Sequence, residues 1–85
     1  MNKHIYAIRD CKVGSFAPPC LFENDSVAIR AFGSMVEADV KEGKGLLGSH
    51  PEDFCLYRLG SINLESGHID SIEPVSLALA SDFVR

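Results

Sequence analysis

The sequence predicts a small α+β domain, in which an antiparallel sheet of about three strands, in the order β-α-β-β, carries one amphipathic helix on one face. Three observations predict this fold: a strand-like run opens the chain, a stretch of helical periodicity follows, and two further strand-like runs flank a turn. The length of 85 residues has room for one domain. We therefore expect a single domain over 1–85, with 75–85 as an apolar C-terminal arm that docks on it.

Residues 3–9 form the first predicted strand, because they are partly β-branched and aromatic and because Asp10 and Gly14 close the run. The connection over 11–22 contains Pro18-Pro19, which continues neither a helix nor a strand ladder. We expect an ordered, irregular segment there, with each prolyl bond either cis or trans. The two faces of the strand carry His4, Tyr6 and Ile8 on one side and Ile5, Ala7 and Arg9 on the other.

Residues 24–40 carry the clearest helical pattern of the chain. Asn24 or Asp25 is a suitable N-cap, and the polar loop over 41–45 ends the helix. Gly33 inside the helix is either a tolerated glycine or a point of close backbone contact with the sheet. The apolar positions are Ala28, Ala31, Phe32, Met35 and Val36, and the polar stripe opposite them is Ser26, Arg30, Ser34, Glu37 and Lys41.

A hairpin is predicted in the second half of the chain. Residues 50–53 form a helical turn with Pro51 in its first position, and residues 54–59 form the second strand. Gly67 occupies the turn position that needs a positive φ, after which a third strand runs over 68–72 and ends at Pro74. The apolar residues over 75–84 are expected to dock, as helical turns or as an extended arm.

Both faces of the second strand carry bulky apolar side chains, with Phe54 and Leu56 on one side and Tyr57 and Leu59 on the other. One helix covers only one face, so another element must cover the second. Because so small a domain buries a limited share of its surface, we expect self-association. The simplest form is a twofold dimer through the sheet face, a sheet edge or the C-terminal arm.

Composition and motifs exclude several classes of function. The formal net charge of −4 argues against a protein that coats nucleic acid or an anionic membrane by bulk charge, and the apolar runs are too short for a membrane span. No nucleophile, base and orienting acid can be assembled from a recognisable motif, so we expect no enzyme and no cofactor. The spacing of the histidines, His4, His50 and His68, matches no zinc site, so we expect no metal. The odd number of cysteines indicates reduced thiols in a cytosol; they are Cys11, Cys20 and Cys55.

Aromatic and cationic side chains alternate on the first and second strands. Rings and guanidinium groups on a sheet are what single-stranded nucleic acid stacks on, although the same residues also serve as half-buried packing with solvated ends. The cations on or beside ordered elements are the candidate nucleic-acid contacts: Lys3, Arg9, Lys12, Arg30 and Arg58. The candidate stacking residues are Tyr6 and Tyr57.

Several blocks carry a family resemblance: IYAIRD at 5–10, GSFAPP at 14–19, AIRAF at 28–32, HPEDFCLYRLG at 50–60 and SGHI at 66–69. In this order they resemble the small nonstructural protein of gokushovirus-type microviruses (Microviridae), phages with single-stranded DNA genomes. The resemblance implies a role in viral single-stranded DNA synthesis in the host bacterial cytoplasm. It identifies no catalytic residues.

The resemblance implies a regulator of the switch from duplex replication to single-stranded genome synthesis. Such a regulator would bind single-stranded DNA, the replication initiator protein or a host replication enzyme, and the net charge of −4 favours a protein partner. The alternative is an assembly or scaffold protein that joins the procapsid. An uncatalogued enzyme is a more distant third hypothesis.

Overall fold

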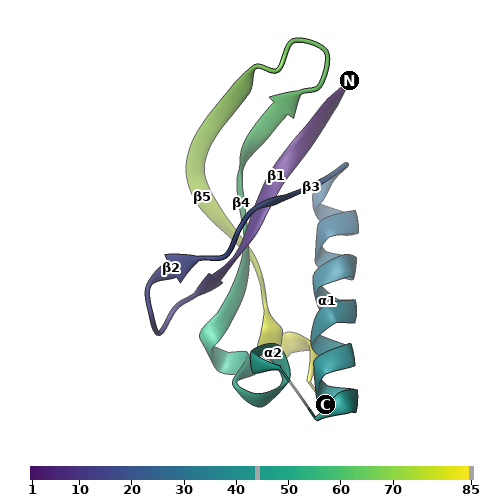
Figure 1. Ribbon diagram of the computed structural model, residues 1–85, viewed down its shortest axis with the longest axis vertical. Coiled ribbons are helices and arrows are strands. Elements are labelled where there is room, and N and C mark those ends of the chain that lie inside the picture. Colours follow the sequence, from purple (N-terminus) through teal and green to yellow (C-terminus); the bar gives the residue numbers. More distant parts are fainter. Residues whose placement is uncertain (44, 85) are drawn as a thin grey trace.

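The computed structural model describes residues 1–43 and 45–84, and it places one long helix against one face of a five-stranded antiparallel sheet (Figure 1). The strands are β1 (Asn2–Asp10), β2 (Ser15–Phe16), β3 (Cys20–Phe22), β4 (Phe54–Asn63) and β5 (Ile69–Leu79). The fold is α+β, as predicted, but the expectation of about three strands was too low.

β1 lies at the centre of the sheet and pairs with β4 along its whole length. Its other edge is shared by two short strands, with β2 opposite Arg9 and Asp10 and β3 opposite the N-terminal half. The segment expected to be irregular therefore contains both extra strands. The proline pair falls between them, so neither strand has to accommodate a residue without an N–H. No peptide bond in the described residues is cis.

The helix α1 (Asp25–Glu42) begins at the predicted N-cap and ends two residues later than predicted. The Asn24 side chain accepts a hydrogen bond from the Val27 N–H at 2.9 Å, and Gly43, with φ 68°, closes the helix by donating its N–H to Val40. Lys41 and Glu42, predicted in the loop over 41–45, belong to the last turn of α1, and Lys44 lies outside the described residues. Two further short helices follow, α2 (Leu46–Ser49), which was not predicted, and the 3₁₀ turn η1 (Pro51–Asp53), which was.

The core lies between α1 and the sheet. Phe32 and Val36 are buried, and they pack in one cluster with Tyr6 and Leu56 from the central strands. Met35, predicted on the same apolar face, is 48% exposed because it lies on the flank of the stripe centred on Phe32. The helix therefore buries a narrower stripe than its apolar positions suggest.

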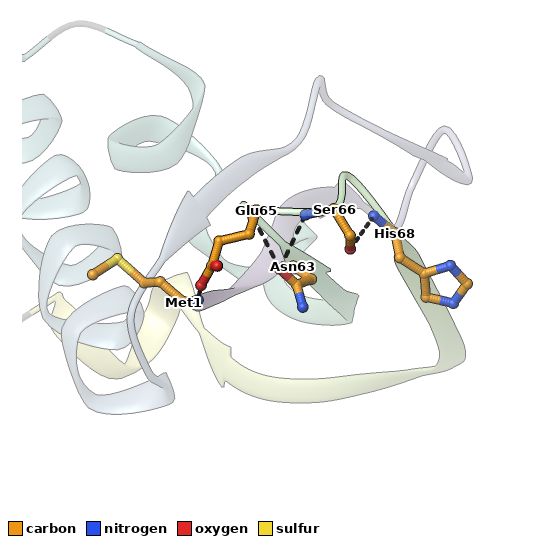
Figure 2. A network of polar contacts seen from close by, with 5 residues as sticks. All are labelled: Met1, Asn63, Glu65, Ser66 and His68. Atoms are coloured by element: carbon orange, nitrogen blue, oxygen red, sulfur yellow. Dashed lines mark hydrogen bonds and ion pairs between the residues drawn. The ribbon is translucent and has the colours of Figure 1, made fainter.

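A network of polar contacts closes the hairpin between β4 and β5 (Figure 2). Asn63 Oδ1 accepts the Glu65 and Ser66 N–H groups at 2.9 and 3.3 Å, and the Met1 amino group lies 2.9 Å from Glu65 Oε1. Gly67 has φ 78° and donates its N–H to the Asn63 carbonyl at 2.7 Å, which confirms the predicted turn glycine.

β5 continues five residues beyond Pro74, which corrects the prediction that this proline ends the strand. Arg58 pairs with Val75 and Gly60 with Ser71, so three residues of β5, including Pro74, lie opposite one residue of β4. This bulge takes Pro74 out of the regular ladder, and β5 is an edge strand with one neighbour. An edge bulge thus tolerates the missing N–H.

Of the predicted arm over 75–85, residues 75–79 extend β5, and the segment after them docks on the helix and not on the second face of the sheet. After β5 the chain forms the 3₁₀ turn η2 (Ala80–Phe83), whose Phe83 ring lies edge-on to Phe32 with centroids 5.9 Å apart. A Cβ on Gly33 would lie 2.7 Å from the Phe83 ring, so Gly33 is a point of close contact, although with η2 and not with the sheet. Arg85, the last residue of the predicted arm, lies outside the described residues. No described helix packs across the face of the sheet opposite α1 (Figure 1).

Candidate nucleic-acid interface

The open face of the sheet brings together side chains from three neighbouring strands. Arg9 of β1 pairs with Phe16 of β2, while Ala7 of β1 pairs with Tyr57 of β4. Directly paired residues of antiparallel strands project to the same face, and residues two apart on one strand share that face. Arg9, Phe16 and Tyr57 therefore form one group on the face opposite α1, which we call the platform.

In the platform, a cation contacts one aromatic ring, and that ring contacts a second one. The guanidinium carbon of Arg9 lies 5.1 Å from the centroid of the Phe16 ring. The rings of Phe16 and Tyr57 meet edge-to-face, with centroids 5.5 Å apart and an interplanar angle of 87°. Phe16 remains 36% exposed. The guanidinium group thus lies over the Phe16 ring, and part of the ring remains exposed to solvent.

A tight turn places Phe16 on the platform. Asp10 Oδ1 accepts the Lys12 and Val13 N–H groups at 3.0 and 3.2 Å, and the Asp10 carbonyl accepts the Gly14 N–H at 2.8 Å. Gly14 has φ 84°, which turns the chain back so that β2 pairs with the end of β1. The position of Phe16 is therefore set by the Asp10 side chain and by backbone hydrogen bonds.

Small residues beneath the platform are buried. Ala7 and Cys55, small residues on the same face, are only 1% and 7% exposed, so larger side chains around them already exclude water. Within the described part of the chain, no carboxylate lies within ion-pair distance of Arg9.

Tyr6 and Arg58 lie on the opposite, helix-covered face and are joined to Asp25. The Tyr6 hydroxyl donates to Asp25 Oδ1 at 2.8 Å, and Arg58 Nη1 forms an ion pair with Asp25 Oδ2. We call these three residues the clamp, because they tie the first residue of α1 to β1 and β4. Tyr6 is fully buried, so the prediction that its ring stacks on a base is corrected, and Arg58 is already engaged by a carboxylate.

The clamp shifts the titration of its acidic groups. Burial, followed by the hydrogen bond to Asp25, raises the pKa of Tyr6. The hydrogen bond from Arg58, followed by that from Tyr6, lowers the pKa of the Asp25 carboxyl. Asp25 is therefore held in its charged form, as a structural ion pair requires.

The three remaining predicted cations are scattered. Lys3 lies near the start of β1, with Nζ 3.8 Å from Glu23 Oε1, and Arg30 is exposed on the side of α1 that faces away from the core. Lys12 is exposed in the turn between β1 and β2, next to the platform along the chain. Of the predicted site residues, the structure brings Arg9 and Tyr57 together at Phe16, and it brings Tyr6 and Arg58 together at Asp25.

The sequence interpretation missed Phe16. It lies in the segment expected to be irregular, and its place on the sheet depends on the turn from Asp10 to Gly14. The available signal was an aspartate followed four residues later by a glycine and then by an aromatic residue, a pattern typical of a tight turn into a short strand.

Two other features have no comparable set of contacts. His50, Glu52 and Asp53 have potential ligand atoms within 4.8 Å of one another, but the group sits on a largely exposed turn. A cavity of about 210 Å³ lies between α1, the sheet and the Pro18 segment, and its lining is predominantly apolar. Among the described residues, no helix has the length and apolar character needed to cross a membrane.

Comparison with known proteins identifies the family. The family model described as "Phage ORF5 protein" matches residues 3–83. No curated protein and no solved structure matches the chain. Because the family match spans nearly the whole chain, this protein belongs to the phage ORF5 protein family.

Proposed function

We propose that this phage protein is a non-enzymatic regulator of viral DNA replication that contacts single-stranded DNA through the platform. The process is the switch from duplex replication to synthesis of single-stranded genomes, in the host bacterial cytoplasm. Membership of a phage protein family supports the viral setting, and the resemblance to gokushovirus nonstructural proteins suggests the process.

One observation carries the proposal: Arg9 lies over Phe16, and Phe16 meets Tyr57, on a face that no described helix covers. A single strand can place an unpaired base on an aromatic ring and the adjacent phosphate at a guanidinium group. In a duplex the bases are stacked inside the helix and do not offer their faces. The platform therefore favours single strands over duplex.

The size of the platform limits the affinity of one protomer. Each base stacked on an aromatic ring contributes roughly 1–3 kcal/mol, and two rings in edge-to-face contact offer room for one or two bases. One phosphate contact on a single strand gives a slope of log K against log salt of about −0.7, and Lys12 as a second contact would double it. We expect weak binding with a shallow salt dependence.

The edge strand β5 supports self-association, which would raise the effective affinity for a strand. β5 spans 11 residues with one strand neighbour, and Ile69, Ile72 and Val75 are exposed along it. Exposed apolar edge strands pair readily with another strand, and the part of β5 after Pro74 contains neither proline nor a charged residue. We propose that a second copy pairs there, so light scattering should report a mass above 9.3 kDa, and a monomer at every concentration would contradict it.

The test is a titration of a labelled oligothymidine and of a matched duplex at several salt concentrations. The variant is Arg9→Gln, and the matched control is Arg30→Gln, which removes the same charge from the exposed side of α1. We expect Arg9→Gln to weaken single-strand binding about tenfold, since a charge-assisted contact contributes about 1.5 kcal/mol or more. Arg30→Gln should bind like the unaltered protein.

Equal losses in both variants, or no binding of either DNA at low salt, would contradict the contact with DNA. In that event a pull-down with the replication initiator protein tests the protein-partner version of the same role. Stoichiometric co-purification with procapsids would favour the assembly or scaffold alternative.

A further inference from the structure

Two cysteine thiols from distant parts of the chain meet at the end of the β1–β4 ladder. Cys11 Sγ and Cys55 Sγ are 3.5 Å apart, although 44 positions separate the residues. Cys11 is exposed in the turn after β1, whereas Cys55 is buried near the start of β4.

The backbone fixes this contact. The Cys11 N–H donates to the Asp53 carbonyl at 2.8 Å, and Cys55 is the register partner of Arg9. Both sulfurs are therefore positioned by residues of the central strand pair. A disulfide needs the sulfurs to approach to about 2 Å, and the exposed turn that carries Cys11 can supply the shift.

We propose that Cys11 and Cys55 form a modification site, an oxidisable thiol pair that a small-molecule disulfide such as oxidised glutathione converts into an intramolecular disulfide. The third cysteine, Cys20, is the thiol left over from the odd number in the chain. The inference does not depend on nucleic-acid binding.

The exchange proceeds in two balanced steps. The exposed Cys11 thiolate attacks one sulfur of oxidised glutathione, which forms a mixed disulfide and releases one glutathione thiolate. The Cys55 thiolate then attacks the Cys11 sulfur and releases the second glutathione. The protein loses two electrons and two thiol protons, and the disulfide reagent becomes two glutathione molecules.

Burial of Cys55 slows the second step. In the reduced protein, burial, followed by the hydrogen bond with Cys11, raises the pKa of Cys55 to about 11. The mixed disulfide removes the Cys11 thiol, so burial is the cause that still keeps the Cys55 thiolate scarce at neutral pH. The proximity of the two sulfurs compensates for the scarcity of the Cys55 thiolate, because the mixed disulfide on Cys11 forms beside the attacking Cys55 sulfur.

The product would link the turn over 11–14 covalently to β4. That turn leads into β2, which carries Phe16, so the bond would hold the two sides of the platform together. Closing a long loop restricts the unfolded chain more than the folded one. The oxidised protein should therefore melt at a higher temperature than the reduced protein.

The experiment uses the full chain, reduced and then incubated with oxidised glutathione, followed by thiol blocking and mass spectrometry. Cys20→Ser keeps the pair, and Cys11→Ser removes its exposed member without altering the buried site. We expect Cys20→Ser to lose two hydrogens, to yield a linked Cys11–Cys55 peptide and to melt higher after oxidation. Cys11→Ser should show neither the linked peptide nor the rise in melting temperature.

The inference is overturned if Cys20→Ser carries only glutathione adducts or intermolecular links. It is also overturned if the unaltered protein joins Cys20 to either of the other cysteines in preference to linking Cys11 to Cys55.

Discussion

Each face of the sheet carries a tyrosine and an arginine on adjacent strands, but the two pairs make different contacts. On the covered face, Tyr6 and Arg58 converge on Asp25, and the Asp25 carboxylate neutralises the charge of Arg58. On the open face, Arg9 and Tyr57 converge on Phe16, which supplies a ring instead of a carboxylate. A tyrosine and an arginine on adjacent strands therefore become a structural clamp or an exposed platform according to the third residue that they meet.

The largest contrast between the faces should appear in stability. Phe32→Ala removes a ring that is 1% exposed from the centre of the covered face and should cost roughly 3–5 kcal/mol, comparable to the whole stability of a small domain. Phe16→Ala, which removes a ring from the open face, should cost roughly 1 kcal/mol. Urea unfolding followed by circular dichroism measures both. Equal losses would show that the open face is as much a part of the core as the covered one.

The close packing of the C-terminal turn η2 on α1 can be tested at Gly33. In Gly33→Ala the new methyl group meets the Phe83 ring, so the variant should lose about 1–3 kcal/mol although alanine favours a helix. Combining it with Phe83→Ala removes the clash, and the second substitution should then cost less than it does alone. Thermal unfolding of the single and double variants measures the coupling. A stabilised Gly33→Ala would contradict the close packing of η2 on α1.

The clamp should give the smallest effect, because Asp25 and Arg58 are only partly buried. The folded state lowers the pKa of Asp25, so its contribution to stability is present above the unfolded-state pKa of about 3.9 and is lost as the pH falls through the folded-state value. Asp25→Asn should therefore be less stable than the unaltered protein at neutral pH. The difference should shrink as the pH falls below about 4. A difference that is independent of pH would contradict the ion pair.

Local signals explain which elements the sequence predicts. Three signals act within a few residues: the N-cap Asn24, the helical spacing of Ala28, Phe32 and Val36, and the turn glycine Gly67. The start of α1 and the turn of the hairpin are therefore predicted correctly. The short strands β2 and β3 consist of two and three residues and exist only because β1 lies beside them. Such pairing leaves no periodicity to read.

The residues of the candidate interface were also predicted only in part, because their grouping depends on contacts between distant parts of the chain. Alternation along the first strand places Arg9 and Tyr6 on opposite faces, but it does not say which face the helix covers. That choice depends on Asp25, which the fold brings to Tyr6 and Arg58 from the start of α1. Likewise, Pro74 ends a strand by local rules, and only the bulge opposite β4 shows why β5 continues.

The most direct test of the account is an amide NMR titration of the protein with a short oligothymidine, because it reports which face of the sheet the strand contacts. We expect the largest shifts at Arg9, Phe16 and Tyr57, with Lys12 beside them, and no change at Arg30 on α1. Shifts that cluster on α1, or a spectrum unchanged at saturating oligothymidine and low salt, would contradict the assignment of the open face as the nucleic-acid interface.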